Sequence, residues 1–337
     1  MSNKTVKLKF VGFWPNFKPE MSFTYNCLIN NGYNVQVVED ADYIVCSIFG
    51  EKYEYCKYPQ VRIMEVEENY IPDFNLVDYG ICHYPITLQD RCFSFPVCVE
   101  YVDGTLKKLT EKNRDYSSDI LKQKTLFANF IASHESEYNI RGDFFKKLNE
   151  YKRVESAGSY LNNMPNGALV NREDGSKTEL QQTCKFTLCF ESTKHEGFVT
   201  EKIAEAFLTD SIPIYYGSSM AKEIFNKNAY IDIADYNSFD DAVKKIIELD
   251  NNDEEYLKML SQPIFKDSNY YQNKMEQLEK FICHIFEQPI EKAYRRSRVY
   301  WPQKYNDYFV NCNLQNKTVA PKKACVIKRI IKKLLKK

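Results

Sequence analysis

The sequence is poor in glycine and has no long apolar run. Its 337 residues include 11 glycines, and none of them forms a G-x-G-x-x-G or G-x-x-x-x-G-K-S/T pattern, which argues against a nicotinamide dehydrogenase or a P-loop nucleotidase. A membrane-spanning helix needs about 18 consecutive apolar residues, and no such run is present. The first residues, MSNKTVKLKF, also lack the apolar core of a secretory signal. We therefore expect a cytoplasmic protein, long enough for two domains.

The cysteines do not have the spacing of a metal site. There are 11 of them, an odd number, and no two are spaced as Cys-x-x-Cys. Cys184 and Cys189 bracket a strand-like segment, and Cys82-His83 lies far from them, so packing by small apolar side chains explains these residues better than zinc does. We expect reduced thiols and no metal ion.

Positive charge is concentrated at the end of the chain. The totals balance, with 46 Lys and Arg against 46 Asp and Glu, but residues 322–337 hold eight of the bases and no acid. Six aliphatic residues recur there at helical spacing, which predicts an amphipathic helix lying on an anionic membrane surface. A solvated tail or a nucleic-acid arm is the alternative. The aliphatic stripe favours lipid, so we expect no nucleic-acid partner and a peripheral location on the inner membrane.

The body of the chain alternates strands and helices in a βα order, which is typical of Rossmann-like sheets. A polar stretch at residues 103–118 suggests an insertion or linker between two such sheets. The expected strands of the first sheet are 7–13, 34–38, 43–49, 61–66 and 79–84, with a helix at 21–31. The expected strands of the second are 125–131, 185–190, 212–217 and 226–234, followed by helices at 240–249 and 254–287.

Residues 190–217, FESTKHEGFVTEKIAEAFLTDSIPIYYG, say most about function. A glycine-containing polar loop leads into an amphipathic helix, which Thr200 is expected to cap with its hydroxyl. Glu201 and Lys202 occupy the first turn, where unpaired backbone N–H groups favour an anion. Lys202 opposes the helix dipole there unless an anion or a carboxylate compensates its charge. The segment predicts a phosphate site at the carboxyl edge of a parallel sheet; an ordinary αβ unit is the alternative.

The extended segment CFESTKHEGFVTEKIAEAFLTDSIPIYYGS resembles the signature of the α-1,3-fucosyltransferases of glycosyltransferase family 10, particularly the bacterial enzymes that make Lewis-type antigens. A second block at residues 68–79, ENYIPDFNLVDY, is similar to the family's N-terminal segment. Weaker similarities lie at residues 127–145 and at Phe13-Trp14-Pro15. Together these blocks cover most of the chain up to about residue 285.

The resemblance implies the α/β GT-B fold, in which two Rossmann-like domains face each other across a cleft. We expect an acceptor-binding domain at residues 1–122 and a GDP-fucose-binding domain at 123–287. A segment at 288–321 would cross back onto the first domain, and the basic amphipathic tail would follow at 322–337.

The implied reaction is the inverting transfer of L-fucose from GDP-β-L-fucose to a hydroxyl, O3 of GlcNAc in a LacNAc-type glycan, to give an α-fucoside. No cofactor is required. The acceptor would be an oligosaccharide or a lipid-linked glycan, in Lewis-antigen, lipopolysaccharide or protein glycosylation. Two alternatives stay open: another metal-independent inverting GT-B glycosyltransferase with a different nucleotide sugar, and a non-catalytic membrane-docked protein that binds a glycan or nucleotide.

An inverting transfer needs a carboxylate that takes the proton of the attacking hydroxyl. Glu68 follows the predicted strand 61–66 and stands at the position of the family's proposed base. Its neighbours Glu65 and Glu67 compete for the role, and a solvated acidic turn is the structural alternative. Asn69 and Trp14 are the acceptor-side candidates.

The resemblance also supplies the donor site. Arg141 and Lys202 match the family's donor-binding arginine and phosphate-binding lysine, and their charges would replace a metal ion at the diphosphate. Glu201 matches a carboxylate that contacts donor hydroxyls. Pairing of Arg141 with Asp143, and a favourable helix-start charge at Glu201, are the alternatives.

Three further residues complete the expected donor site, and two of them depart from the family pattern. Glu191 opens the signature. Ser192 replaces an asparagine found in many members, and Phe198 replaces a tyrosine. Loss of that hydroxyl removes one possible hydrogen bond, worth about 0.5–1.5 kcal/mol, so we expect donor binding to survive.

Overall fold

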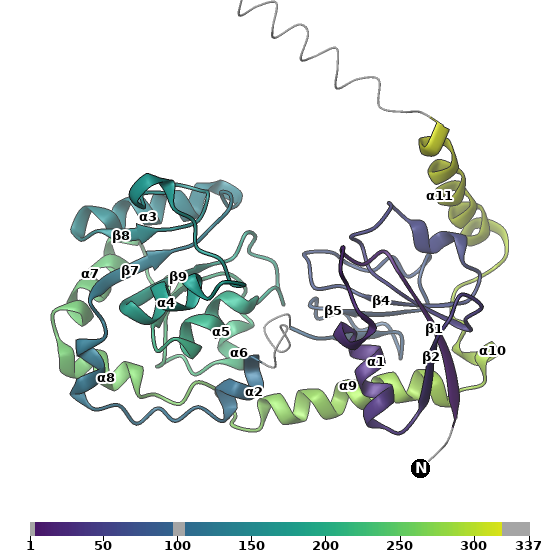
Figure 1. Ribbon diagram of the computed structural model, residues 1–337, viewed down its shortest axis with the longest axis horizontal. Helices are drawn as coiled ribbons and strands as arrows, with labels where there is room; N and C mark the ends of the chain where they lie inside the picture. The colour runs from purple at the N-terminus through teal and green to yellow at the C-terminus, as the bar shows by residue number, and fades with distance from the viewer. Residues whose placement is uncertain (1–3, 97–104, 319–337) are drawn as a thin grey trace, which may run out of the picture.

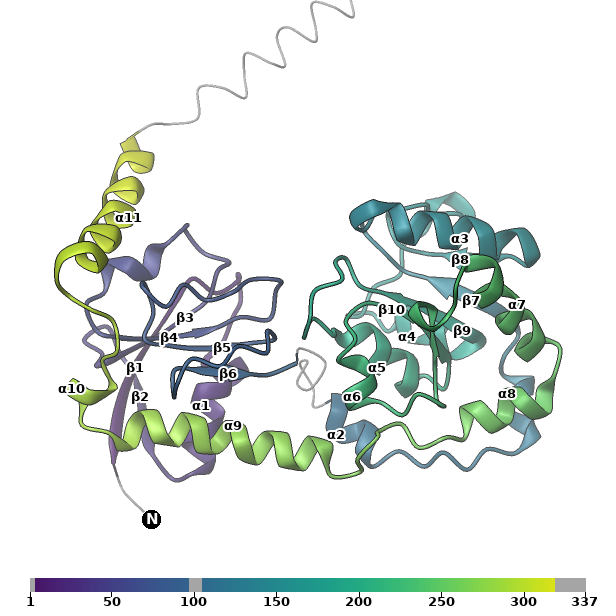
Figure 2. The same ribbon diagram turned by 180° about the vertical axis from the view of Figure 1, so that it is seen from behind.

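Two parallel β-sheets form the centres of two lobes in the computed structural model of the protein, which describes residues 4–96 and 105–318 (Figures 1 and 2). Strands and helices alternate through both lobes. This confirms the predicted α/β fold with two Rossmann-like domains. The predicted tail at residues 322–337 lies outside the described residues.

The first sheet has six parallel strands in the order β2-β1-β3-β4-β5-β6. Alternate residues point to opposite faces, so Val45 and Ile63 lie in one apolar layer while Ile44 and Met64 lie in another. The strands are β1 (Thr5–Val11), β2 (Asn34–Val37), β3 (Tyr43–Cys46), β4 (Val61–Glu65), β5 (Tyr79–Cys82) and β6 (Cys92–Ser94).

The second sheet has five parallel strands in the order β11-β10-β9-β7-β8. Phe186 and Ile214 lie in the apolar layer on one face, and Cys189 and Tyr215 lie in the layer on the other. The strands are β7 (Leu126–Phe130), β8 (Val154–Ser156), β9 (Cys184–Phe190), β10 (Ile212–Tyr216) and β11 (Ile231–Asp232).

Helices cover both faces of the second sheet, as parallel sheets require. Apolar residues of α3 (Ile140–Tyr151), α7 (Phe239–Asp250) and α8 (Asp253–Leu260) pack on one face. The other face receives α4 (Ser176–Thr183) and α5 (Glu201–Leu208), and α6 (Ala221–Ile224) follows β10. In the first domain α1 (Phe23–Asn30) covers one face.

A long helix joins the two lobes along their base (Figures 1 and 2). This helix, α9 (Tyr270–Glu287), contacts α1 and buries Leu278, Ile282 and Phe286 in the core of the first domain. The segment expected as one helix at 254–287 is therefore two helices, α8 and α9. The crossing to the first domain begins with α9, before the boundary predicted at residue 287.

The residues after α9 stay on the first domain. Arg296 donates from Nε to the buried carboxylate of Asp78 at 2.9 Å. The last described helices are α10 (Ile290–Ala293) and α11 (Tyr300–Thr318), and α11 lies at the outer side of this lobe (Figures 1 and 2). No helix in the described ranges combines the length and apolar character that a membrane span needs.

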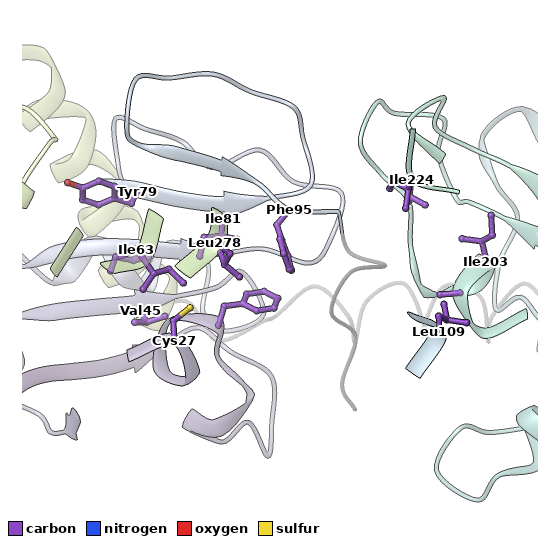
Figure 3. Packing of buried hydrophobic residues seen from close by; sticks show 14 of the residues in the cluster. Cys27, Val45, Ile63, Tyr79, Ile81, Phe95, Leu109, Ile203, Ile224 and Leu278 are labelled. Atoms are coloured by element: carbon purple, nitrogen blue, oxygen red, sulfur yellow. The ribbon is translucent and has the colours of Figure 1, made fainter. Parts of the chain in front are cut away.

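A short helix in the polar stretch predicted as a linker connects the two hydrophobic cores. This helix, α2 (Thr105–Thr110), contacts both α5 and α9. Figure 3 shows Leu109 of α2 on the side of Ile203, while Leu278 lies among strand residues of the first domain. All three side chains are buried members of one apolar cluster. The contact between the domains on this side is therefore hydrophobic.

Candidate active site

The main cavity lies where the strand order of each sheet reverses. In the first sheet this switch point is between β1 and β3, and in the second it is between β7 and β9. Loops leaving the carboxyl ends of these strands diverge there and leave room for a ligand. The cavity has a volume of about 550 Å³. Its described lining comes from both domains: Trp14, Met21, Phe49, Glu67, Glu68, Ile131, Ala132, Ser133, His134, Arg141, Ser192, Phe198, Thr200, Glu201 and Lys202.

The wall from the first domain combines two aromatic rings, Trp14 and Phe49, with Met21 and two glutamates. Gly12 turns the chain after β1 with φ of +76°, and a Cβ there would lie 2.6 Å from the carbonyl oxygen of Ser47. This turn presents Trp14 to the cavity, where its ring meets the edge of Phe49 at 5.5 Å between centroids. Phe49 is 41% exposed. Trp14, predicted on the acceptor side, is thus in the cavity.

Three neighbouring glutamates have different environments: Glu65 ends β4, and Glu67 and Glu68 follow it. Glu65 is buried, and its carboxylate accepts hydrogen bonds from Ser22 Oγ at 3.0 Å and from the Thr24 backbone N–H at 2.8 Å, at the start of α1. Burial raises its pKa, opposed by these bonds. Glu65 therefore fixes a helix and does not line the cavity, whereas Glu67 and Glu68 do. Glu68 is exposed.

Arg141 lies at the start of α3 and is held by backbone carbonyls. Its Nε and Nη2 donate to the carbonyl oxygen of Phe190 at 3.1 and 2.7 Å, and its Nη1 donates to that of His134 at 3.0 Å. Burial lowers its pKa, opposed by the charge of Glu191. Arg141 as a whole residue is 3% exposed, yet it lines the cavity. Asp143 pairs with Lys146 instead, at 3.9 Å, so the alternative of an Arg141–Asp143 pair is wrong.

The start of α5 is organised by a carboxylate that directly follows the preceding strand, β9. Glu191 accepts hydrogen bonds from the Thr200 backbone N–H and hydroxyl, each at 2.8 Å, and from Lys202 Nζ at 3.2 Å. The Thr200 hydroxyl makes no cap bond to the helix, so the expected side-chain cap is wrong. Glu191 competes for that hydroxyl and also compensates Lys202. It does not line the cavity; it orients the residues that do.

Charges around Lys202 keep the first turn ionised. Burial lowers the pKa of Lys202, but the carboxylates of Glu191 and Glu201 outweigh this and raise it. Burial likewise raises the pKa of Glu201, but the cations Lys202, Lys177 and Arg172 lower it to about 2. Both side chains line the cavity as a cation and an anion. The predicted pair at the helix start is therefore present.

The signature loop also contacts the first domain. Gly197 has φ of +86°, and a Cβ there would lie 2.1 Å from the carbonyl oxygen of His83. Phe198, which lines the cavity, packs on the His83 ring at 4.8 Å between centroids. Asn69 Nδ2 donates to Thr193 Oγ1 at 3.0 Å, and its carbonyl accepts from Tyr84. Asn69, predicted on the acceptor side, is thus in a domain contact and outside the cavity lining.

His83 was missed by the sequence reasoning except as a possible metal ligand. It is fully buried between the domains, and neither ring nitrogen has a hydrogen-bond partner in the described part of the chain. Burial, with the charge of His195, lowers its pKa to about 4. The adjacent Cys82 indicates that this strand end is buried. The contact between His83 and Gly197 joins distant parts of the chain, and no local sequence pattern predicts it.

Two protein-family models match the chain. The C-terminal domain of glycosyltransferase family 10 (fucosyltransferase) matches residues 121–302, and the N-terminal domain of the alpha-(1,3)-fucosyltransferase FucT matches residues 8–101. The first of these covers more than half of the chain. It includes the residues that form the second-domain wall of the cavity.

Curated relatives agree with the family models. The chain is 30% identical over 227 residues to alpha-(1,3)-fucosyltransferase FucT of Helicobacter pylori, covering 59% of this chain and 46% of the relative. It is 28% identical over 130 residues to 4-galactosyl-N-acetylglucosaminide 3-alpha-L-fucosyltransferase 9 of Homo sapiens, covering 38% of this chain and 34% of the relative. The chain thus spans less than half the length of these relatives.

Solved structures agree with the fold. A crystal structure of an alpha1,3-fucosyltransferase superposes with a TM-score of 0.71 at 25% identity, covering 89% of this chain and 94% of the other. A crystal structure of an alpha1,3-fucosyltransferase with GDP-fucose superposes with a TM-score of 0.65 at 25% identity, covering 84% and 91%. The GT-B assignment is thereby confirmed, and the chain belongs to glycosyltransferase family 10, the fucosyltransferases.

Proposed function

We propose that this protein transfers L-fucose from GDP-β-L-fucose to a sugar hydroxyl with inversion of the anomeric centre. The observation that carries the proposal is the division of the cavity walls. An exposed carboxylate, Glu68, lines it from the first domain, while Arg141 and Lys202 line it from the second. An acceptor hydroxyl and a diphosphate need these two kinds of group on opposite sides of the transferred sugar.

Glu68 is the proposed base. Its carboxylate would take the proton of the attacking hydroxyl as the bond from fucose to the nucleotide breaks, on the face opposite the leaving group. Glu67 lines the same cavity and remains the alternative. Glu65 is a poor base for this step because it is buried and its Oε1 accepts two hydrogen bonds at the start of α1.

Arg141 and Lys202 are the proposed binders of the diphosphate. The guanidinium has its orientation fixed by two carbonyl groups before any ligand arrives, and the ammonium is fixed by Glu191 and Thr200. Such preorganised cations stabilise negative charge that develops on the leaving group without a reorganisation cost. We therefore propose that no metal ion is required.

The proposed roles of the remaining residues follow from their places. Glu201 would accept a hydrogen bond from a donor hydroxyl, because its pKa of about 2 keeps it an acceptor at neutral pH. Ser192 and Phe198 would line the donor, and Glu191 would act through Lys202. For the acceptor, the human relative's name specifies O3 of a 4-galactosyl-N-acetylglucosaminide, which supports a LacNAc-type glycan here.

The test is a donor and acceptor panel. The protein is incubated with GDP-fucose, GDP-mannose or UDP-galactose and a LacNAc or lacto-N-biose glycoside, with and without EDTA, and nucleotide release and product linkage are measured. We expect transfer from GDP-fucose alone, to O3 of GlcNAc in LacNAc, undiminished by EDTA. Turnover with another nucleotide sugar would support the second glycosyltransferase class, and binding without turnover would support a non-catalytic protein. Loss in EDTA that Mn²⁺ restores would contradict the metal-free proposal.

We also propose that residues 322–337, which lie outside the described residues, bind an anionic membrane surface. The support is the sequence pattern of eight bases and six aliphatic residues. Truncation after Ala320 should abolish binding to phosphatidylserine vesicles and leave transfer to a soluble glycan unchanged. Equal vesicle binding by the truncated chain, or lost activity on the soluble glycan, would contradict the proposal.

A further inference from the structure

A second groove adjoins the cavity on the first domain. It has a volume of about 490 Å³ and is lined by residues of β1, of the loop after β1 and of the end of β2. Its lining is Lys9, Phe10, Gly12, Phe13, Trp14, Phe17, Pro19, Val37, Val38 and Glu39. Trp14 is the residue that borders both this groove and the main cavity. The two spaces are thus neighbours that share one aromatic wall.

The rings along this wall form a continuous array. Phe13 and Phe17 are stacked, with centroids 3.8 Å apart and planes 19° from parallel. The Trp14 ring then stands nearly perpendicular to Phe17, at 5.1 Å and 86°, and nearly perpendicular to Phe49, at 5.5 Å and 89°. Phe17 lies in the groove and Phe49 in the main cavity. One aromatic surface therefore leads from the groove into the proposed acceptor side.

The backbone fixes this array. The Gly12 turn is bonded to the loop after β3, because the Gly12 carbonyl oxygen accepts from the N–H groups of Phe49 at 2.7 Å and of Gly50 at 3.0 Å. A Cβ on Gly50 would lie 2.6 Å from the Cα of Gly12, so the two loops touch through glycines. Trp14 and Phe49 are carried on these two joined loops and keep their positions relative to each other.

The groove combines apolar side chains with two charged residues. Lys9 and Glu39 form an ion pair there, in which the Glu39 side chain is 91% exposed. Val37 is 49% exposed. A pyranose ring has an apolar C–H face and an edge of hydroxyl groups. Aromatic rings beside the exposed Glu39 carboxylate and its half-buried Lys9 partner fit both parts of it.

We propose that this groove is a second saccharide subsite, which binds sugar units of the acceptor beyond the one that receives fucose. A glycan whose reacting hydroxyl meets Glu68 would pass over Trp14 and stack its next units on the Phe13 and Phe17 side. The preferred acceptor is then an oligosaccharide longer than a disaccharide. This inference rests on the proposed transfer to a glycan.

The kinetic test compares a LacNAc disaccharide with a LacNAc hexasaccharide. We expect the wild-type protein to have the higher kcat/KM on the hexasaccharide. Phe17→Ala should lower that value by about threefold to tenfold, the scale of one aromatic contact, through KM. Its kcat/KM on the disaccharide and its GDP affinity should not change. Phe17→Tyr should restore the preference, and Tyr308→Ala, which removes an exposed ring on α11, should have no effect.

A binding measurement separates this inference from the proposed activity. The chain has two tryptophans, and Trp301 is 78% exposed on α11. In a Trp301→Phe background Trp14 is the single tryptophan, so its emission, excited at wavelengths that tyrosine does not absorb, reports on both spaces. The hexasaccharide should reach its half-maximal change in Trp14 emission at a lower concentration than the disaccharide does. Phe17→Ala should remove this difference in binding, whether or not the protein transfers fucose. Equal titration by the two glycans, or an equal kinetic loss on both in Phe17→Ala, would overturn the subsite.

Discussion

The two walls of the cavity differ in how their side chains are held. On the second domain, Arg141 and Lys202 are fixed by buried partners before any ligand arrives. On the first domain, Trp14 and Phe49 are held by edge-to-face ring packing and by the loops that carry them, and Glu68 is exposed. The difference follows the ligands proposed for each wall. A diphosphate always carries the same charge, so cations in fixed positions bind it well. Glycans vary in structure, and an aromatic surface can bind many of them.

If the walls divide the chemistry in this way, the largest effect should come from the one proposed base. Glu68→Gln should lower kcat by about 10²- to 10⁴-fold because it removes a proton acceptor and keeps the shape. Steady-state transfer to LacNAc measures this. Glu67→Gln is the matched control in the same turn, and it should retain activity. Near wild-type turnover by Glu68→Gln, together with lost turnover in Glu67→Gln, would identify Glu67 as the base.

The fixed order of the donor wall should depend on Glu191. Glu191→Ala leaves Lys202 and the Thr200 N–H without their buried partner, so we expect the free energy of unfolding to fall by about 3 kcal/mol. Urea denaturation followed by circular dichroism measures it. Glu196→Ala is the control, because it removes an exposed carboxylate of the same loop that bonds Ser219. Equal small losses in both variants would show that the network does not stabilise the domain.

The orientation of Arg141 should matter as much as its charge. Arg141→Lys keeps the charge but cannot donate to the Phe190 and His134 carbonyl groups at once. We expect GDP affinity to fall by about tenfold or more, the scale of a lost charged hydrogen bond of about 1.5–3 kcal/mol. Calorimetric titration with GDP measures this. If a folded Arg141→Lys protein binds GDP with unchanged affinity, Arg141 contributes only its positive charge, and its orientation does not matter.

A smaller effect should appear with pH at the contact between the domains. His83 has a pKa of about 4 when buried, against about 6.5 unfolded, so the unfolded chain binds the proton first as pH falls. Its stability contribution is full above about pH 6.5 and is lost as pH falls toward 4, by about 2 kcal/mol at pH 5. Urea midpoints at pH 7 and pH 5 measure it. His83→Phe should reduce the difference between them, and an identical difference would assign the acid sensitivity to other groups.

Much of the fold was predictable because its signals are local. The βα order follows from short apolar segments that form strands, and the helix start at Glu201 follows from the change of period after the signature loop. The crossing of α9 was misplaced at residue 287 because an amphipathic stripe shows that a helix packs but not on which sheet. Only the tertiary structure assigns Leu278 to the first domain.

The sequence predicted which residues form the site better than it predicted the contacts between them. Glu68, Arg141, Glu201 and Lys202 do line one cavity, as residues at strand ends and helix starts should. The Thr200 cap was wrong because Glu191, nine residues earlier in the chain, competes for the hydroxyl. The roles of Glu65 and His83 also depend on distant partners, Ser22 in one case and Gly197 in the other, and such partners leave no periodic signal.

Calorimetric titration of GDP into Glu68→Gln and Lys202→Ala, beside the wild-type protein, tests the division of the two walls most directly. The diphosphate contacts only the donor wall in this account, so Glu68→Gln should bind GDP with wild-type affinity while Lys202→Ala binds it at least about tenfold more weakly. Weakened binding by Glu68→Gln, or wild-type binding by a folded Lys202→Ala protein, would contradict it.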